Sequence, residues 1–234
     1  MAAFVLIPGG WAGGWVWQKL TPLLRAAGHE VYTPTLTGLG ERLHLAHTGV
    51  DLDTHITDII NVLAFEDLHD VTLVGWSYGG MVMTGVADRV PQRLAQLISL
   101  DATIPQDGES FNDCWPEDGG AFREAATAAS PPGMLPVPIA WFEAVVTDVV
   151  TRDWLLSRMV ALPFATLEQP IRLDNAAAPV PASYIRCTEQ DEAEPAFLGR
   201  IRSDPAWRFR ELAADHMAPV TAPHETADML LSLV

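Results

Sequence analysis

Cysteines and basic residues are scarce in this sequence. The two cysteines, Cys114 and Cys187, lie far apart and lack the spacing of metal ligands, which argues against a disulfide framework and against a zinc site. Only 14 basic residues accompany 30 acidic ones, and the formal net charge of −16 would repel phosphate backbones and anionic lipids. We therefore expect no nucleic-acid partner.

Long apolar runs are missing as well. No stretch approaches the roughly 20 apolar residues that are needed to cross a bilayer. The N-terminus has no basic segment, and the apolar run at residues 4–7 is too short to direct export. These absences predict a cytoplasmic protein that does not associate with membranes.

The composition that remains is typical of one compact domain, with 49% hydrophobic and 19% charged residues in a chain of 234. Short apolar runs bounded by Gly or Pro alternate with longer segments of helical period. This alternation predicts an α/β fold with a mostly parallel sheet flanked by helices. The strands are expected at residues 4–7, 30–33, 71–74, 97–100, 182–186 and 207–211, and the helices at residues 16–27, 52–65, 80–89 and 222–233.

The alternation stops between residues 104 and 173, where no convincing strand is present and residues 130–138 are rich in proline. A structureless loop of that length is rare in a compact domain. We therefore expect residues 104–173 to form a helical cap over a core made of residues 1–103 and 174–234. Most of its aromatic side chains should pack the cap against the core, with a minority lining a cavity; they are Phe111, Trp115, Phe122, Trp141, Phe142, Trp154 and Phe164.

The most informative motif lies at residues 75–79, which read Gly-Trp-Ser-Tyr-Gly between an expected strand and an expected helix. A Gly-x-Ser-x-Gly pattern in this context is typical of the nucleophile elbow of α/β-hydrolases. Glycine at Gly75 and Gly79 lets the neighbouring backbone approach closely enough for a tight, strained turn. Ser77 would then stand at a helix N-terminus, where free N–H groups favour developing negative charge.

A serine hydroxyl needs a base, commonly a histidine that a carboxylate orients, and in this fold the order along the chain is Ser, acid, His. Only His216 and His224 of the 7 histidines follow Ser77. His216 lies in a loop after the last expected strand and is the predicted base, whereas His224 starts a helix and is expected at the surface. Earlier histidines are expected on loops or helix faces, with His44 or His47 able to reach the rim of the site.

The acid is predicted to be Asp191, which follows the expected strand 182–186. Asp101 is the serious alternative, because it directly follows the strand 97–100 and some hydrolases place the acid there. Side chains that are adjacent in a loop tend to point apart, which disfavours the carboxylate next to His216. The carboxylates expected to have no direct part are Glu189, Glu192 and Asp215.

A tetrahedral intermediate also needs hydrogen-bond donors for its oxyanion. In α/β-hydrolases the donors are the N–H of the residue after the nucleophile and an N–H from an earlier loop, which in this chain is the loop after the first expected strand. Tyr78 and Gly10 occupy these positions. The glycines of residues 8–15 would let that loop pass close to a reacting carbonyl.

Taken together, these residues resemble the plant methylesterase and hydroxynitrile lyase family of α/β-hydrolases and its bacterial esterase relatives. The similarity covers nearly the whole chain and rests on residues 4–10, 13–17, 75–80, 189–192 and 215–216. The resemblance implies a triad of Ser77, Asp191 and His216, with Gly10 and Tyr78 as oxyanion donors. It also implies that no cofactor or metal is needed.

Three positions depart from the pattern of that family. Pro8 replaces a histidine in the first loop, which puts the hydrogen bonds of that loop in doubt, and Trp76 replaces a histidine before the serine, which should change packing beneath the elbow rather than the mechanism. Met217 follows His216, where the hydroxynitrile lyases of this group carry a lysine that manages the charge of cyanide. This difference favours ester cleavage over C–C cleavage.

The sequence therefore predicts a serine esterase that cleaves a small, largely apolar carboxylic ester through an acyl-enzyme. The competing hypotheses are a C–C lyase, a lactone-processing biosynthetic enzyme, and a ligand receptor without catalysis. A small-molecule ester is the expected partner, and a homodimer is left open.

Overall fold

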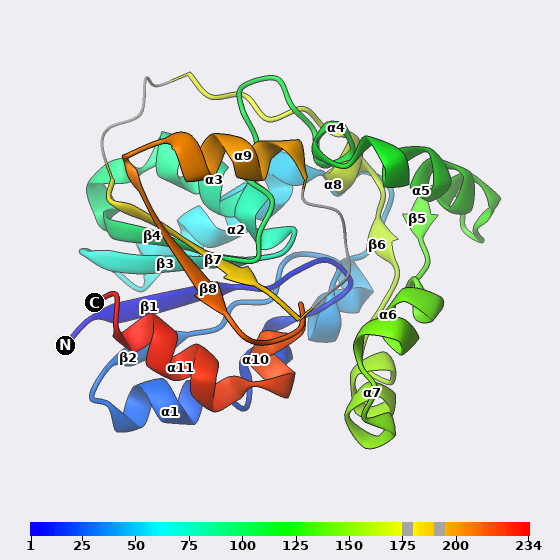
Figure 1. Cartoon of the computed structure of the whole chain (residues 1–234). Helices are drawn as coiled ribbons and strands as arrows, with labels where there is room; N and C mark the ends of the chain where they lie inside the picture. The colour runs from blue at the N-terminus through cyan, green and yellow to red at the C-terminus, as the bar shows by residue number, and fades with distance from the viewer. Residues whose placement is uncertain (175–179, 190–194) are drawn as a thin grey trace.

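The computed structural model of the chain describes residues 1–174, 180–189 and 195–234. Its centre is a six-stranded sheet in the order β2-β1-β3-β4-β7-β8, in which every neighbouring pair is parallel (Figure 1). All six expected strands are present, so the prediction of a parallel α/β sheet is confirmed. Their bounds are β1 Ala3–Ile7, β2 Glu30–Tyr32, β3 Val71–Trp76, β4 Leu94–Leu100, β7 Ala182–Cys187 and β8 Trp207–Leu212.

Helices cover both faces of this sheet. In β1, Phe4 and Leu6 pack into one apolar cluster and Val5 and Ile7 into another, because successive side chains of a strand point to opposite faces. Figure 1 shows α2, α3 and α9 on one face and α1 and α11 on the other. These helices span Leu52–Phe65 (α2), Gly79–Arg89 (α3), Ala196–Ser203 (α9), Thr21–Ala26 (α1) and Pro223–Leu231 (α11).

The local sequence explains where the helices begin. Asp51 caps α2 by accepting a hydrogen bond from the N–H of Thr54, in a reciprocal capping box. The single helix expected at residues 16–27 is wrong, because the chain there forms a 3-10 helix, η1 (Gly14–Trp17), followed by α1. Pro22 lacks an N–H and suits the first turn of a helix better than its interior, so α1 starts anew beside it. The remaining short elements are η2 Gly40–Leu45, η3 Pro91–Arg93 and α10 Ala218–Thr221.

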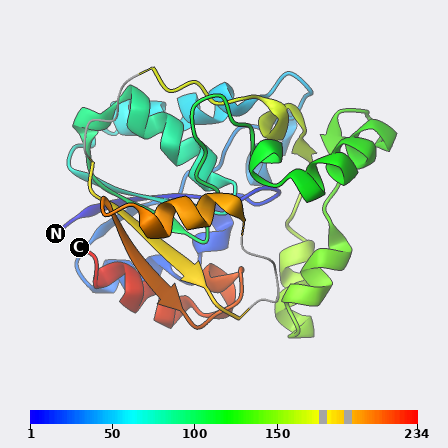
Figure 2. The same ribbon diagram turned by 45° about the horizontal axis from the view of Figure 1, so that its top comes forward.

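The segment expected as a cap, residues 104–173, adds no strand to the main sheet. It also contains a short antiparallel pair, β5 (Met134–Leu135) with β6 (Leu162–Pro163), which the sequence analysis did not predict. Two-residue strands are too short to show an alternating pattern. Figures 1 and 2 show α5, α6 and α7 standing to one side of the sheet. The helices of the segment are α4 Phe111–Cys114, α5 Pro116–Ala128, α6 Ile139–Val145, α7 Val149–Leu156 and α8 Ala165–Glu168.

Trp11 joins this segment to the core. Its indole Nε1 donates to the carbonyl oxygens of Leu135 (3.2 Å) and Pro136 (3.1 Å). Its own carbonyl oxygen accepts a hydrogen bond from the N–H of Val160 at 3.1 Å. Both the side chain and the backbone of Trp11 therefore attach the loop after β1 to residues 104–173.

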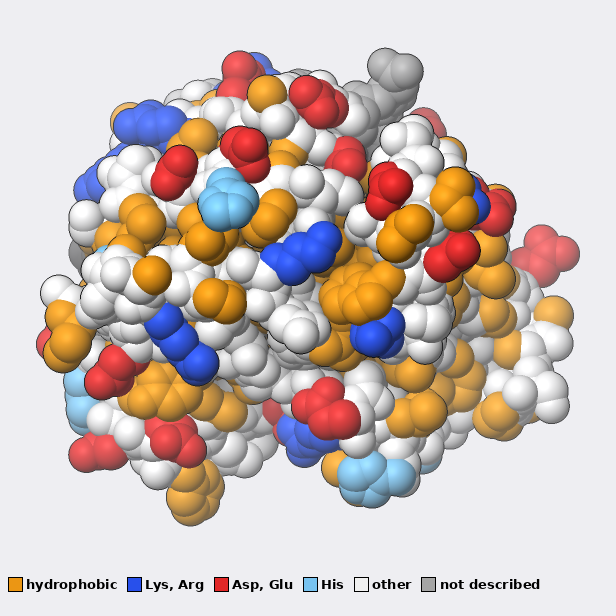
Figure 3. Space-filling view, turned by 90° about the horizontal axis from the view of Figure 1, so that it is seen from below, with side chains coloured by type: hydrophobic (Ala, Val, Ile, Leu, Met, Phe, Trp, Pro, Cys, Tyr) orange, Lys and Arg blue, Asp and Glu red, His pale blue; other side chains and the backbone are white. Residues whose placement is uncertain are grey.

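The face of the molecule seen from below in Figure 1 carries a mixed surface. Acidic, basic and apolar side chains are interspersed over it (Figure 3). No helix in the described part of the chain is both long enough and apolar enough to cross a bilayer.

The close packing of α3 against the loop after β4 gives a test of the fold. A Cβ at Gly80 would lie 2.9 Å from the Cβ of Ala102 and still closer to the carbonyl oxygen of Thr103. Gly80→Ala should therefore lower the free energy of unfolding by about 2–4 kcal/mol in denaturant titrations. Gly120→Ala is the matched control, because nothing lies within 4 Å of its Cβ and alanine favours a helix. Equal stabilities of the two variants would contradict this packing.

Candidate active site

A cavity of about 240 Å³ opens at the carboxyl ends of the strands. Gly10 follows β1, Ser77 follows β3, Asp101 follows β4 and His216 follows β8, and all four line this cavity. The chain runs from β1 outward to β2 and then returns to β3 on the other side of β1. Open parallel sheets bind their ligands at such a reversal, outside the carboxyl ends of the strands. The topology thus brings together residues from distant parts of the sequence.

Ser77 occupies a strained turn between β3 and α3. Its φ of 56° lies in the left-handed region, which is uncommon for a residue with a side chain. A Cβ at Gly75 would lie 2.7 Å from the carbonyl oxygen of Gly79, and one at Gly79 would lie 2.8 Å from that of Ile7. The glycines at these two positions therefore permit the turn, as the sequence motif predicted.

His216 receives its orientation from Asp101. The Nδ1 of His216 and the Oδ2 of Asp101 are 2.7 Å apart, and the carboxylate is the acceptor, so Nδ1 carries the hydrogen. This leaves Nε2 free to accept a proton. Asp101 itself has a left-handed φ of 45°, and its N–H donates to the carbonyl oxygen of Ile185 at 2.7 Å.

The other oxygen of Asp101 has different partners. Its Oδ1 accepts hydrogen bonds from Arg186 Nη1 at 2.8 Å and from the N–H of Cys187 at 3.2 Å. Burial alone would raise the pKa of Asp101. The hydrogen bond and charge of His216, together with Arg186, outweigh that effect and hold the pKa below its usual value. Asp101 is therefore an ionised, doubly paired carboxylate.

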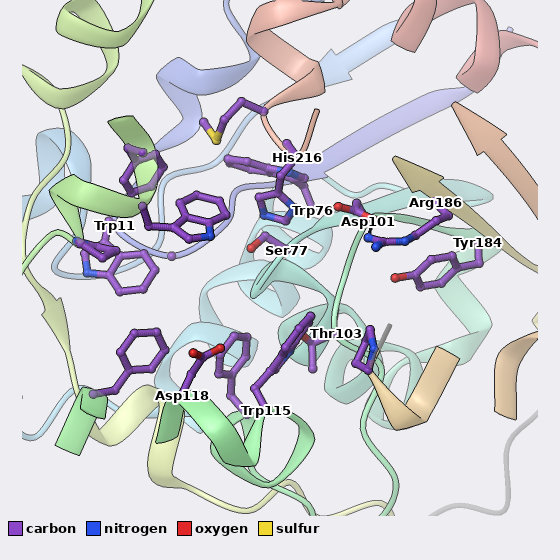
Figure 4. Close-up of a pocket in the computed structure, with 18 residues that line it drawn as sticks. Trp11, Trp76, Ser77, Asp101, Thr103, Trp115, Asp118, Tyr184, Arg186 and His216 are labelled. Carbon is purple, nitrogen blue, oxygen red and sulfur yellow. Dashed lines mark hydrogen bonds and ion pairs between the residues drawn. The ribbon is translucent and has the colours of Figure 1, made fainter. Parts of the chain in front are cut away.

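Figure 4 shows Ser77 and His216 side by side at the cavity, with Asp101 next to the imidazole and Arg186 beyond Asp101. The backbone holds the serine and the acid together, since the N–H of Ser77 donates to the carbonyl of Leu100 (3.3 Å) and the N–H of Thr103 donates to the carbonyl of Ser77 (3.1 Å). Among the described residues, no hydrogen bond joins the Ser77 hydroxyl to His216. In enzymes without substrate this contact is often long.

The preferred acid, Asp191, lies outside the described residues, as does Glu192. In the described part of the chain Asp101, the alternative of the sequence analysis, provides the carboxylate on His216. Asp215 points into its own loop, where it accepts from the N–H of Met217 and from the hydroxyl of Thr221, both at 2.8 Å. Glu189 and His224 are exposed, and neither they nor His44 and His47 are among the described residues that line the cavity.

Trp76 positions His216, a role that the sequence did not predict. Its indole Nε1 donates to the carbonyl oxygen of His216 at 2.8 Å, and its ring lies 5.5 Å from the imidazole. The residue before the serine therefore fixes the backbone of the histidine from 140 positions away. The available signal was the tryptophan itself, which stands where the family that the sequence resembles usually has a histidine. From it the sequence predicts a change in packing but not this hydrogen bond.

The backbone N–H groups of Gly10 and Tyr78 have no acceptor among the described residues. Gly10 lines the cavity, and Tyr78 is the residue directly before α3. Free donors at these two places are suited to binding a developing oxyanion.

The Tyr78 side chain is buried on the other side and bonds to His55 of α2. Its hydroxyl is 2.9 Å from His55 Nδ1, and His55 Nε2 is 2.9 Å from the carbonyl oxygen of Thr37. A carbonyl only accepts, so Nε2 carries the hydrogen and Nδ1 accepts from the tyrosine hydroxyl. Burial lowers the pKa of His55 to about 4, against the opposing effects of the Thr37 hydrogen bond and of nearby carboxylates. His55 is therefore neutral at physiological pH.

The walls of the cavity are rich in aromatic side chains. Five of the seven cap aromatics line it, namely Phe111, Trp115, Phe122, Trp141 and Phe142, so the expectation that only a minority would do so is wrong. The indole nitrogens of two wall residues are used elsewhere: Trp115 donates to the hydroxyl of Thr103 at 2.9 Å, and Trp11 donates to the cap. Their rings thus present apolar surface to a ligand.

No group of three or more His, Cys, Asp or Glu side chains able to hold a metal is present among the described residues. Cys114 and Cys187 are both buried free thiols, and burial raises the pKa of Cys114 to about 12. In the structure the two cysteines are not joined in a disulfide.

Residues 4–229 match the sequence profile of the alpha/beta hydrolase family. The chain belongs to this family. A carbendazim hydrolyzing esterase of Nocardioides sp. (strain SG-4G) is 37% identical over 244 residues, covering 100% of both chains. The polyneuridine aldehyde esterase of Rauvolfia serpentina is 26% identical over 253 residues, covering 98% of this chain and 94% of that protein.

Among solved structures, an extracellular α/β-hydrolase from a Paenibacillus species, described as sharing structural and functional homology with tobacco salicylic acid binding protein 2, superposes with a TM-score of 0.85. It is 26% identical, and the match covers 99% of this α/β-hydrolase and 98% of that chain. The predicted fold and the resemblance to the methylesterase group are confirmed. The esterases among these relatives also agree with ester hydrolysis as the predicted reaction.

The buried His55 gives a test that depends on pH. In the unfolded chain its pKa returns to about 6.5, so folding releases a proton between that pH and about 4. Stability is then lost as the pH falls through this window, by up to about 3 kcal/mol. His55→Gln should lose less stability than the parent between pH 7 and pH 4.5, measured by denaturant titration. His224→Gln, at an exposed position, should follow the parent; parallel curves for His55→Gln and the parent would exclude the effect.

Proposed function

We propose that this α/β-hydrolase cleaves small, largely apolar carboxylic esters, with Ser77 as nucleophile, His216 as base and Asp101 as the orienting acid. The observation that carries the proposal is the hydrogen bond from His216 Nδ1 to Asp101 beside a strained serine in one cavity. Nδ1 has a single hydrogen, and Asp101 accepts it. For this reason we propose Asp101, rather than Asp191, as the acid.

The reaction would proceed in two halves. Nε2 of His216 takes the proton of the Ser77 hydroxyl as the oxygen attacks the ester carbonyl, and the N–H groups of Gly10 and Tyr78 stabilise the oxyanion. The imidazolium then gives its proton to the departing alcohol, leaving an acyl group on Ser77. Water, activated by the same imidazole, attacks the acyl-enzyme and releases the acid.

The cavity supports a small and mainly apolar substrate. A volume of about 240 Å³ leaves room for a compact molecule, and its walls are rich in aromatic side chains. Met217, directly after His216, is fully buried and lines the same cavity, so that position supplies an apolar surface and no positive charge. This supports ester cleavage over the C–C lyase alternative, and an assay with mandelonitrile beside p-nitrophenyl butyrate compares the two.

Ser77→Ala tests the nucleophile. The variant should hydrolyse short aryl esters at least about 1,000-fold more slowly than the parent, because only substrate binding and the oxyanion donors remain. A fluorophosphonate should label the parent at one site and leave Ser77→Ala unlabelled. The exposed Ser232→Ala is the control and should label like the parent. A Ser77→Ala variant with near-parental turnover would rule out the mechanism.

Carbendazim should be assayed alongside the aryl esters, because a relative of this chain is named for hydrolysing it.

Asp101→Asn tests the acid. An asparagine can donate to Nδ1, which would place the hydrogen of the imidazole on Nε2 and remove the base, so kcat should fall by about 10³ to 10⁴. Asp191→Asn is the comparison and should stay within about tenfold of the parent. Thermal melting checks that both variants are folded. The reverse order of the two losses would return the acid role to Asp191.

A further inference from the structure

Arg186 is a charged residue within a buried strand of the sheet. Its side chain is 11% exposed and that of Asp101, its ion-pair partner, is 2% exposed. A buried guanidinium is costly unless it is paired. Among the described residues that line the cavity, Arg186 is the one cation of Lys or Arg type. Such a residue at this place calls for a reason beyond the folding of β7.

Orientation of Asp101 does not require a charge at residue 186. The N–H of Cys187 already donates to Oδ1, and the N–H of Asp101 is held by the carbonyl oxygen of Ile185. What Arg186 adds is a full positive charge, placed on the oxygen that His216 does not use. Whenever the imidazole of His216 is protonated, each oxygen of the Asp101 carboxylate therefore interacts with a different cation.

We propose that Arg186 is a positioning residue that sets the pH range in which His216 works as a base, by sharing the negative charge of Asp101. A carboxylate that faces only an imidazole stabilises the imidazolium with its whole charge. With Arg186 on the other oxygen that stabilisation is smaller, and the guanidinium also repels the imidazolium directly. His216 then stays unprotonated, and able to accept the serine proton, down to a lower pH. The inference rests on the proposed function, in which Asp101 orients the base.

Other titratable groups surround His216 and stay the same when only residue 186 is changed. Asp215 precedes His216 and bonds within its own loop. Burial raises the pKa of the Cys187 thiol and of the Tyr184 hydroxyl, so both stay neutral. Asp118 of α5 lies across the cavity from His216 (Figure 4). The ring centroids of Trp76 and Trp141 lie 5.5 and 5.4 Å from that of the imidazole. Residues 190–194, which include Asp191, Glu192 and Glu194, lie outside the described part of the chain.

The experiment measures the rate at which a fluorophosphonate labels Ser77 between about pH 5 and pH 9, where a histidine base titrates. This readout needs no knowledge of the natural substrate. Arg186→Gln, which can still donate a hydrogen bond but has no charge, should move the midpoint of the acidic limb upward by roughly half to one pH unit. Arg186→Lys, which keeps the charge, should leave the midpoint within about 0.2 of the parent.

Each outcome bears on a different claim. If the fluorophosphonate does not label Ser77 of the parent at any pH, the proposed function itself is contradicted. A parent that is labelled, with an unmoved or lowered midpoint in Arg186→Gln, overturns the role of Arg186 while leaving the mechanism intact. Thermal melting at pH 7 verifies that Arg186→Gln is folded. Should it not fold, Arg186→Lys still decides, because an upward shift of half a unit or more in that variant overturns the proposal.

Discussion

The hydrogen bond between Asp101 and His216 connects residues 115 positions apart, and the site is arranged around it. Asp101 has a left-handed conformation after β4, between Leu100 and Thr103 in the chain, and the backbones of these two residues both form hydrogen bonds with Ser77. His216 is held in turn by Trp76, the residue before the serine. Parallel pairing of β3, β4, β7 and β8 brings these residues together, because it places the carboxyl ends of all four strands at one edge of the sheet. A slip in register of any one strand would separate groups that must stay within hydrogen-bonding distance.

Features encoded by neighbouring residues could be predicted from the sequence. The six strands, the bounds of α2 and the elbow at residues 75–79 each have a signal within about ten residues: an apolar run, a capping box, a glycine pair. The partner of His216 had no such signal. Asp101 and Asp191 both follow strands that end at the same edge, so the sequence pattern left both open. Arg186 within an apolar strand was an available hint, since a buried cation calls for a carboxylate nearby.

The cap shows a second reason for failure. Apart from α5, its helices and strands are short, and one or two turns of helix give too few positions to reveal which face is apolar. Phe111 and Phe142 therefore could not be assigned to the cavity from the sequence, although both line it. The tryptophans add a further ambiguity, because a ring can face a ligand while its nitrogen bonds to the protein. Trp115 does so through Thr103.

Trp11 connects residues 104–173 to the loop that carries Gly10. Its indole and its carbonyl oxygen both form hydrogen bonds with residues 104–173, and its neighbour in the chain is Gly10, which lines the cavity. An outward shift of residues 104–173 would have to break these hydrogen bonds or move Gly10 as well. The position of the backbone at Gly10 and the size of the cavity are therefore coupled through Trp11.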